Sequence, residues 1–224
     1  MKTMTLFSAI DISGITTIVG YVIYLALAAI AIWGGYCVSM AWTRVSRQRF
    51  SSEDDQNEFL NQVDEPLLKG DFDSAARVCQ EDSRATPQLA LLAINHRKSG
   101  YAKVKQLVAD RFQRDVLGDL EHRLNWVNTV INTAPMVGLL GTVIGMMGAF
   151  GKLYSSEGPV APTVLAGDIM TALITTACGL AIAIPLRFFT QTINIRISKL
   201  EDLVGVGMSR FFDSFRDALT RSSN

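Results

Sequence analysis

Residues 125–151 read NWVNTVINTAPMVGLLGTVIGMMGAFG and contain no charged side chain over 27 positions. A helix needs roughly 20 apolar residues to cross the hydrocarbon core of a bilayer. Residues 12–43 are also uncharged, over 32 positions, and residues 169–186 are uncharged over 18. The last of these runs is short for a span, and it becomes long enough if the helix begins before Asp168 and includes that residue. The sequence therefore predicts an all-α membrane protein with three transmembrane helices, at 18–43, 125–151 and 163–187.

The composition agrees with a membrane protein and shows no catalytic motif. Hydrophobic residues make up 49% of the chain and the mean hydropathy is +0.23, which is high for a soluble domain. The net charge is zero, so no basic field favours nucleic acid. The three cysteines and two histidines form no disulfide framework or metal-ligand pattern, and no nucleophile elbow, phosphate loop or paired-carboxylate motif occurs. We expect no enzymatic activity, no metal and no cofactor.

The first apolar run begins after a basic residue, as a signal peptide does. Lys2 precedes the run, but the apolar stretch continues past Trp33 and Tyr36 to Trp42. Signal peptides have apolar cores of about 7 to 15 residues. We therefore expect a retained helix, with these aromatic side chains anchoring one end at the membrane interface.

Basic residues predict which helix ends face the cytoplasm, because lysine and arginine favour the cytoplasmic side of short connections. Between the second and third helices Lys152 is the only basic residue, so residues 1–17 and 152–162 are predicted to be periplasmic. Residues 44–124 are then a cytoplasmic helical domain, and residues 188–224 a cytoplasmic carboxyl-terminal helix. The basic residues nearest the spans on this side are Arg44, Arg47, Arg49, Arg111, Arg114, Arg123, Arg187, Arg196 and Lys199.

The predicted cytoplasmic domain has the pattern of short helices. The spacing of its apolar residues predicts a helix over 53–68, ended by Gly70. Asp73 predicts the cap of a second helix that runs through Gln80. Pro87 predicts the start of a third.

Two long apolar stripes extend the spans beyond the membrane. The third short helix ends before Gly100, and no proline occurs from Ala102 until Pro135. Between Ala102 and Pro135 apolar residues recur at steps near three and four, and a second stripe of this kind follows Arg187. We expect each stripe to pack either on a neighbouring copy of the chain or on the other extension. The stripe residues are Val104, Leu107, Val108, Leu117, Leu120, Leu124 and Val127, then Ile193, Ile197, Leu200, Val204 and Phe211.

Glycines form one face of the second span. Gly138, Gly141, Gly145 and Gly148 fall mainly within one sector of the helix, which permits close approach of another helix. Thr142 lies at the edge of this face. It either lines a polar path or bonds back to its own helix beside a packing face.

The third span has a polar face of small residues. Asp168, Thr171, Thr175, Thr176 and Gly179 lie on one side, and the larger apolar residues lie on the other. A polar stripe several turns long favours a water-accessible path lined by protein over packing alone. Asp168 is either part of this path or a carboxylate at the outer water interface. The opposite face holds Met170, Leu173, Ile174 and Ile184.

Two prolines lie near the predicted cytoplasmic ends of the second and third spans. Pro135 and Pro185 are expected to bend their helices and to free carbonyl groups that need other polar partners.

Two motifs resemble a known family. Residues 133–150, TAPMVGLLGTVIGMMGAF, and residues 168–185, DIMTALITTACGLAIAIP, resemble the ExbB/TolQ branch of the MotA/TolQ/ExbB proton channel family. The resemblance implies a pentamer around two helices of a single-span ExbD/TolR-like partner, whose membrane aspartate carries the ion. It also implies that Thr142 and Thr176 face this path. Gly179, on the small face of the third span, is predicted to be a helix-packing residue.

One position departs from the family pattern. Where ExbB and TolQ carry a glutamate in the third span, this chain has Thr171. Two hypotheses remain open: Asp168, one turn outward, partly replaces that carboxylate, or the extra hydroxyls of Thr171 and Thr175 serve sodium rather than protons.

The resemblance implies an ion-conducting stator subunit in the bacterial inner membrane that uses proton or sodium motive force to drive a partner, with a TonB/TolA-like protein as a further candidate partner. The competing hypotheses are a flagellar or gliding-type stator, although that branch usually has four spans, and a membrane scaffold that conducts nothing. Hydroxyl groups both donate and accept hydrogen bonds, so rings of them can pass a proton through water or coordinate a cation.

Overall fold

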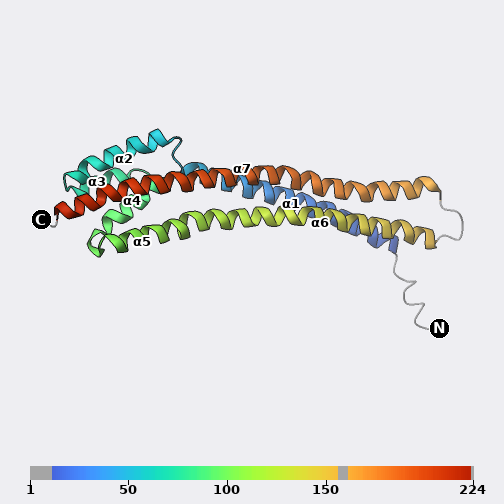
Figure 1. Ribbon diagram of the computed structural model, residues 1–224. Coiled ribbons are helices and arrows are strands. Elements are labelled where there is room, and N and C mark those ends of the chain that lie inside the picture. Colours follow the sequence, from blue (N-terminus) through green and yellow to red (C-terminus); the bar gives the residue numbers. More distant parts are fainter. Residues whose placement is uncertain (1–11, 156–160, 223–224) are drawn as a thin grey trace, which may run out of the picture. The chain divides into compact units, whose positions relative to one another are not determined.

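The structure is a computed structural model that describes residues 12–155 and 161–222, with side chains over 18–154 and 161–221. In these ranges every regular element is a helix, as predicted (Figure 1). Three helical stretches are long and apolar enough to cross a membrane, which agrees with the predicted number of spans. They are Ile18–Gln48, Tyr101–Tyr154 and Pro162–Arg221. Which side of the membrane each end faces stays a prediction.

The chain divides into two compact units. We call residues 1–38 and 125–190 the membrane unit, and residues 39–124 and 191–224 the polar unit. The three long helices α1, α6 and α7 supply residues to both. In chain order the elements are α1 (Ile12–Gln48), α2 (Glu53–Leu68), α3 (Phe72–Gln80), α4 (Ala85–Asn95), η2 (Arg97–Ser99), α5 (Tyr101–Arg111), η3 (Phe112–Leu117), α6 (Gly118–Ser155) and α7 (Pro162–Ser222).

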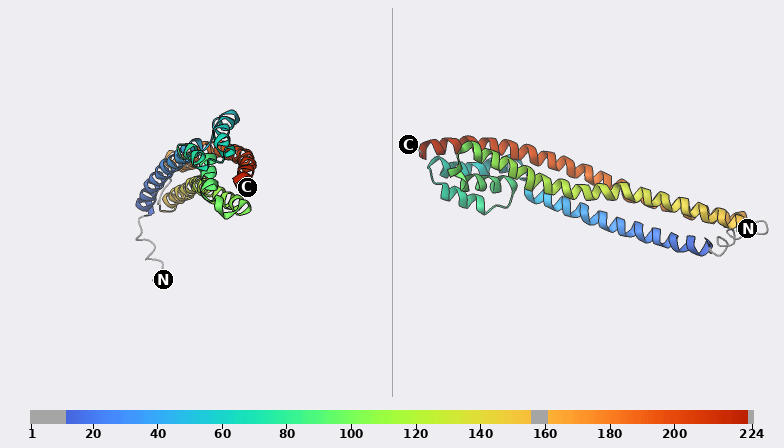
Figure 2. Two further views of the ribbon diagram at one scale, coloured as in Figure 1. Left: turned by 90° about the vertical axis from the view of Figure 1, so that its left-hand side faces the viewer. Right: turned by 90° about the horizontal axis from the view of Figure 1, so that it is seen from below.

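The membrane unit is built from three helices that run alongside one another (Figures 1 and 2). The rings of Trp33 on α1 and Trp126 on α6 meet edge-on, with centroids 6.5 Å apart. A Cβ atom on Gly34 would lie 2.8 Å from side-chain carbons of both Val130 on α6 and Leu186 on α7. The absence of a side chain at Gly34 therefore lets α1 contact both of its neighbours.

An apolar surface of the membrane unit stays exposed in the single chain. Met170, Leu173, Ile174 and Ile184, which were predicted to lie opposite the polar face of α7, are all exposed. The predicted segregation of the two faces is therefore confirmed. A surface of this kind suits contact with lipid or with another apolar helix.

The short helices of the polar unit follow the sequence pattern closely. The predicted bounds of α2, 53–68, are confirmed, and Gly70 after it has a φ of +78° that favours glycine. The carboxylate of Asp71 caps α3 by accepting the backbone N–H of Ser74 at 3.0 Å. The predicted cap at Asp73 is wrong, because Asp73 lies inside the first turn. Hydrogen bonds from the Ser74 hydroxyl and backbone N–H hold the pKa of Asp71 below its usual value.

The start of α4 also differs from the prediction. The helix begins at Ala85, and Pro87 lies in its first turn rather than at its start. A proline is tolerated there because the first N–H groups of a helix have no partner within it. Gly100 lies just before α5 with a φ of +87°, so the predicted break at this residue is confirmed.

A π-helical turn, η3, joins α5 to α6 over Phe112–Leu117. Val104 and Val108 before it are buried, and so are Leu120 and Leu124 after it. In an uninterrupted α-helix at about 100° per residue, the two pairs would point about 160° apart. The extra residue of a π turn changes the rotation by about one residue, which brings the pairs within about 60°. The predicted long helix is therefore present, and the π turn keeps both ends of its stripe buried.

The apolar stripe of α7 packs within the same chain. In the polar unit, the ring of Phe215 meets Phe72 of α3 edge-on at 6.4 Å, and Phe212 meets Tyr101 of α5 edge-on at 6.0 Å. Phe211 and Phe215 are fully buried. Of the two predicted arrangements, packing of the extensions on each other is the one that the single chain contains.

A buried polar contact joins α2 to α7. The side chain of Gln56 is 3% exposed, and its Nε2 donates to the carbonyl of Leu203 at 2.7 Å. A Cβ atom on Gly207 would overlap the amide of Gln56. At Gly205, on the same helix, a Cβ atom would meet nothing within 4 Å. The space that Gln56 needs therefore depends on glycine at position 207 and not at position 205.

Replacing these two glycines should give opposite results. We expect Gly207→Ala to lower the free energy of unfolding by about 1–3 kcal/mol through overpacking. We expect Gly205→Ala to raise it by about 0.5–1 kcal/mol, since alanine stabilises a helix interior. Thermal unfolding of the purified chain in detergent measures both. Adding Gln56→Ala to Gly207→Ala should recover part of the loss, and equal effects of the two glycine variants would contradict this packing.

Candidate functional site

The interface of α6 and α7 is built from residues with little or no side chain. A Cβ atom on Gly138 would lie 2.7 Å from the carbonyl oxygen of Thr175, and one on Gly179 would lie 2.6 Å from the carbonyl oxygen of Ala134. A Cβ atom on Gly145 would lie 2.6 Å from that of Ala172. The two backbones therefore approach closely along several turns. Close approach of this kind is typical of helix pairs in membranes.

Two hydroxyl groups of α7 meet one carbonyl group of α6. The Oγ1 atoms of Thr175 and Thr176 each lie 3.0 Å from the carbonyl oxygen of Gly138. Thr175 is buried and also lies 2.7 Å from the carbonyl of Ala172 in its own helix. A hydroxyl has one proton to donate and keeps two lone pairs that accept. Both groups therefore retain the capacity to accept a proton or to coordinate a cation.

The other two threonines bond within their own helices. The Thr142 hydroxyl donates to the carbonyl of Leu139 at 2.7 Å, and the Thr171 hydroxyl donates to the carbonyl of Gly167 at 2.9 Å. For Thr142 this is the arrangement expected beside a packing face. Neither bond crosses between helices.

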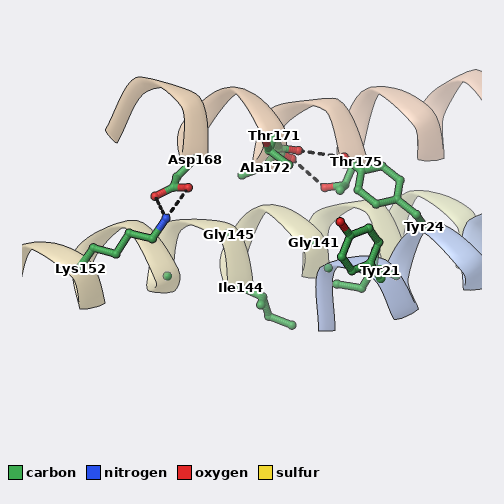
Figure 3. A pocket seen from close by; sticks show the side chains of 13 residues that line it. Tyr21, Tyr24, Gly141, Ile144, Gly145, Lys152, Asp168, Thr171, Ala172 and Thr175 are labelled. Atoms are coloured by element: carbon green, nitrogen blue, oxygen red, sulfur yellow. Dashed lines mark hydrogen bonds and ion pairs between the residues drawn. The ribbon is translucent and has the colours of Figure 1, made fainter. Parts of the chain in front are cut away.

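Asp168 forms an ion pair that the sequence analysis missed. The Nζ atom of Lys152, near the end of α6, lies 2.9 and 2.8 Å from the two carboxylate oxygens of Asp168, near the start of α7 (Figure 3). The Lys152 side chain is 40% exposed and the Asp168 side chain 27% exposed. The sequence did contain one signal for this pair, because Lys152 and Asp168 have opposite charges and lie at the facing ends of two consecutive spans.

A pocket of about 260 Å³ lies between the three helices of the membrane unit (Figure 3). Tyr21 and Tyr24 of α1 close one side, and the Tyr24 hydroxyl donates to the carbonyl of Thr171 at 3.3 Å. The tyrosines were not predicted to take part, because α1 shows no polar periodicity. The α6 and α7 residues that line the pocket are Gly141, Ile144, Gly145, Gly148, Lys152, Asp168, Thr171, Ala172 and Thr175.

The structure brings together some of the predicted pathway residues and separates others. Asp168, Thr171 and Thr175 line one pocket. Thr142 and Thr176 do not line it; Thr176 shares its carbonyl partner with Thr175, and Thr142 bonds to its own helix. The role of each residue in ion movement stays a prediction.

Both prolines lie inside continuous helices, Pro135 in α6 and Pro185 in α7. Proline has no N–H group, so each removes one hydrogen bond from its helix. Pro135 is part of the tight contact, since a Cβ atom on Gly179 would lie 3.2 Å from its Cα atom. The predicted bending of the helices stays a prediction.

The fold and the site define a class: a multi-pass helical membrane protein with an ionisable, hydroxyl-lined pocket among its spanning helices. Residues 85–204 match the family described as "MotA/TolQ/ExbB proton channel family". The match covers more than half of the chain, which therefore belongs to this family.

Curated relatives carry ExbB and TolQ names. The chain is 31% identical to "Putative biopolymer transport protein ExbB homolog" of Methanothermobacter thermautotrophicus, over 81% of this chain and 64% of the relative. It is 36% identical to "Tol-Pal system protein TolQ" of Haemophilus influenzae, over 46% of this chain and 43% of the relative. It is 41% identical to "Biopolymer transport protein ExbB" of Helicobacter pylori, over 43% of this chain and 66% of the relative. The chain thus spans less than two thirds of the length of each, and these names support the ExbB/TolQ branch.

The close approach of α6 and α7 can be tested with two glycines of α7. Gly179→Ala places a Cβ atom against backbone atoms, which cannot rotate away, so we expect the free energy of unfolding to fall by about 1–3 kcal/mol. Gly167→Ala is the matched control, since a Cβ atom there would meet nothing within 4 Å. Thermal unfolding in detergent measures both variants. If Gly179→Ala unfolds at the same temperature as Gly167→Ala, the helices are not in the described contact.

Proposed function

We propose that this chain is an ion-conducting stator subunit of an ExbB/TolQ-like inner-membrane motor. It uses proton or sodium motive force to drive a partner protein in transport or in envelope energy transduction. The observation that supports this function best is the pocket lined by Asp168, Thr171 and Thr175 within helices that are otherwise apolar. Ionisable and hydroxyl groups are costly inside a membrane and mark ion paths when they face a cavity.

The chemistry of the pathway follows from the side chains that α7 presents. A hydroxyl that donates to a carbonyl still offers lone pairs to water or to a cation. Thr175 and Thr176 are adjacent on α7 and both donate to the Gly138 carbonyl, so each keeps lone pairs that can accept from water or bind a cation as it passes. Asp168 adds a carboxylate about two turns away on the same helix. In this proposal Thr142 contributes a further hydroxyl from α6.

The proposed assembly is a pentamer around an ExbD/TolR-like single-span protein with an ion-carrying aspartate, with a TonB/TolA-like protein as a further partner. The exposed apolar side chains of α6 and α7 support contacts with other helices or with lipid. In the proposed orientation, the amino terminus faces the periplasm and residues 44–124 and 188–224 lie in the cytoplasm of a bacterium. The positive-inside distribution of arginine and lysine supports this orientation.

The driving force sets the number of ions that each mechanical step requires. A membrane potential of about 100 mV provides about 2.3 kcal/mol per elementary charge. A step that repacks several side chains costs more than this. Several ions must therefore pass for each large movement of the partner.

A non-conducting scaffold is the competing function, and specific contacts favour it. The hydroxyls of Thr142, Thr171, Thr175 and Thr176 all donate to backbone carbonyls in the single chain. The glycine face of α6 alone would suffice for assembly. Ion flux into liposomes, measured with the partner present, separates the two functions because a scaffold conducts nothing.

Removing a pathway hydroxyl should uncouple the motor without unfolding it. We expect Thr142→Ala or Thr176→Ala to abolish energy transduction while the oligomer stays intact, because each loses a polar group and little volume. Thr129→Ala is a matched control, since the Thr129 hydroxyl bonds to Asn125 of its own helix outside the proposed pathway. Partner-dependent uptake and size-exclusion chromatography provide the two measurements. Normal transduction by both pathway variants would refute the assigned path.

The identity of the ion can be tested with separate gradients. We expect activity driven by a sodium gradient, or proton-driven activity that falls in Asp168→Asn, because this chain has Thr171 in place of the family glutamate. Uptake is measured with a proton gradient alone and with a sodium gradient alone. Activity that needs only protons and is unaffected by Asp168→Asn would defeat both hypotheses about the missing carboxylate.

A further inference from the structure

The amino group of Lys152 is paired with the carboxylate of Asp168, which lines the pocket. Its Nζ atom lies within 2.9 Å of both carboxylate oxygens of Asp168, and both side chains line the pocket (Figure 3). Thr171 and Thr175 follow Asp168 along α7 at steps of three and four, on the same wall. A cation that moves along this wall therefore meets Asp168 at one end, and it meets Lys152 there as a competitor.

The pair has the properties of a contact that opens and closes. Neither side chain is fully buried, with 40% of Lys152 and 27% of Asp168 exposed. Ion pairs with this degree of exposure are weak, because water and salt screen them. The amino group is a compact charge on a flexible four-carbon stem, so it can leave the carboxylate without movement of the helix backbone.

We propose that Lys152 is a tethered cation that controls the access of permeant cations to the pocket. When the amino group is on Asp168, it balances the charge of this carboxylate and a cation gains little by entering. When the stem swings away, the carboxylate is available and attracts a cation from the water. Lys152 is thus a gating residue for ion entry, and the inference rests on the proposed function.

The proposal differs from one in which Asp168 is an obligatory ion carrier. A carrier must be a carboxylate at that position. For a gate, only the pairing of opposite charges across the ends of α6 and α7 matters. Exchanging the two charges separates these cases, because Lys152→Glu with Asp168→Lys restores the pair in reverse.

The experiment uses the full chain with its partner in liposomes, with sodium and proton entry measured by indicator dyes. We expect Lys152→Gln to raise cation flux by about threefold or more, the factor that corresponds to losing a partly exposed ion pair. We expect Asp168→Asn to lower flux by a similar factor, because the carboxylate that attracts cations is then lost while the positive charge of Lys152 remains. The reversed pair should conduct more than Asp168→Asn, and Lys152→Arg, which keeps the charge, should conduct less than Lys152→Gln.

Three results would overturn the gate. These are unchanged flux in Lys152→Gln, reduced flux in Lys152→Gln, and a reversed pair that conducts as poorly as Asp168→Asn. Lys152→Met, which keeps a long apolar stem, replaces Lys152→Gln if that variant loses its oligomer on size-exclusion chromatography. Failure of the proposed function looks different: the unaltered chain then conducts no more than empty liposomes, and the gate falls with it.

Discussion

The contact between the backbones of α6 and α7 is the constraint on which the rest of the membrane unit depends. At Gly138 and Gly179 a single added carbon would lie within 2.7 Å of a carbonyl oxygen of the facing helix. Side chains cannot adjust to relieve such an overlap, so the two helices hold this separation only with glycine at these positions. The same contact brings the hydroxyls of Thr175 and Thr176 within 3.0 Å of the Gly138 carbonyl. Packing and polar chemistry therefore share one interface, and a change in helix separation would alter both.

This shared interface explains why hydroxyl groups, rather than charged groups, follow the α6–α7 contact. In lipid, an unsatisfied polar group is costly, and an isolated charge is costlier still. A threonine hydroxyl finds a carbonyl partner where two backbones approach, as Thr175 does with Gly138 of the facing helix. The carboxylate of Asp168, which lines the pocket, instead has the amino group of Lys152 as its partner. The hydroxyls of Thr171 and Thr175 and the carboxylate of Asp168 thus each have a partner in the single chain, and in the proposed function ion movement requires exchange of these partners.

Periodicity and absence of charge were sufficient to predict the elements of the fold, and insufficient to predict most contacts between them. The uncharged runs predicted three spans, and the apolar spacing of α2 predicted its bounds, because both depend on residues that are close in sequence. The pairs Lys152–Asp168, Gln56–Leu203 and Tyr24–Thr171 join side chains to groups on other elements, and no periodic pattern indicates such partners. The π turn at Phe112–Leu117 was not predicted, although the apolar stripe has a step of nine residues from Val108 to Leu117 at this place. The cap at Asp71 was missed by two residues because two aspartates compete for one helix start.

In the proposed function, the position of the carboxylate on α7 affects how the pocket can discriminate between ions. By resemblance, the family glutamate would stand at position 171, where this chain has a hydroxyl that bonds to Gly167 of its own helix. The charge that remains, on Asp168, lies one turn nearer the start of α7 and is balanced by Lys152, so the pocket has no formal net charge from these residues. An uncharged pocket cannot select cations by attraction alone, and selectivity then depends on the number and spacing of the oxygen atoms that replace the water around the ion. In the proposed function, discrimination between sodium and protons is therefore assigned to the hydroxyls of Thr171 and Thr175. The rate at which cations enter the pocket is assigned to the Lys152–Asp168 ion pair beside them.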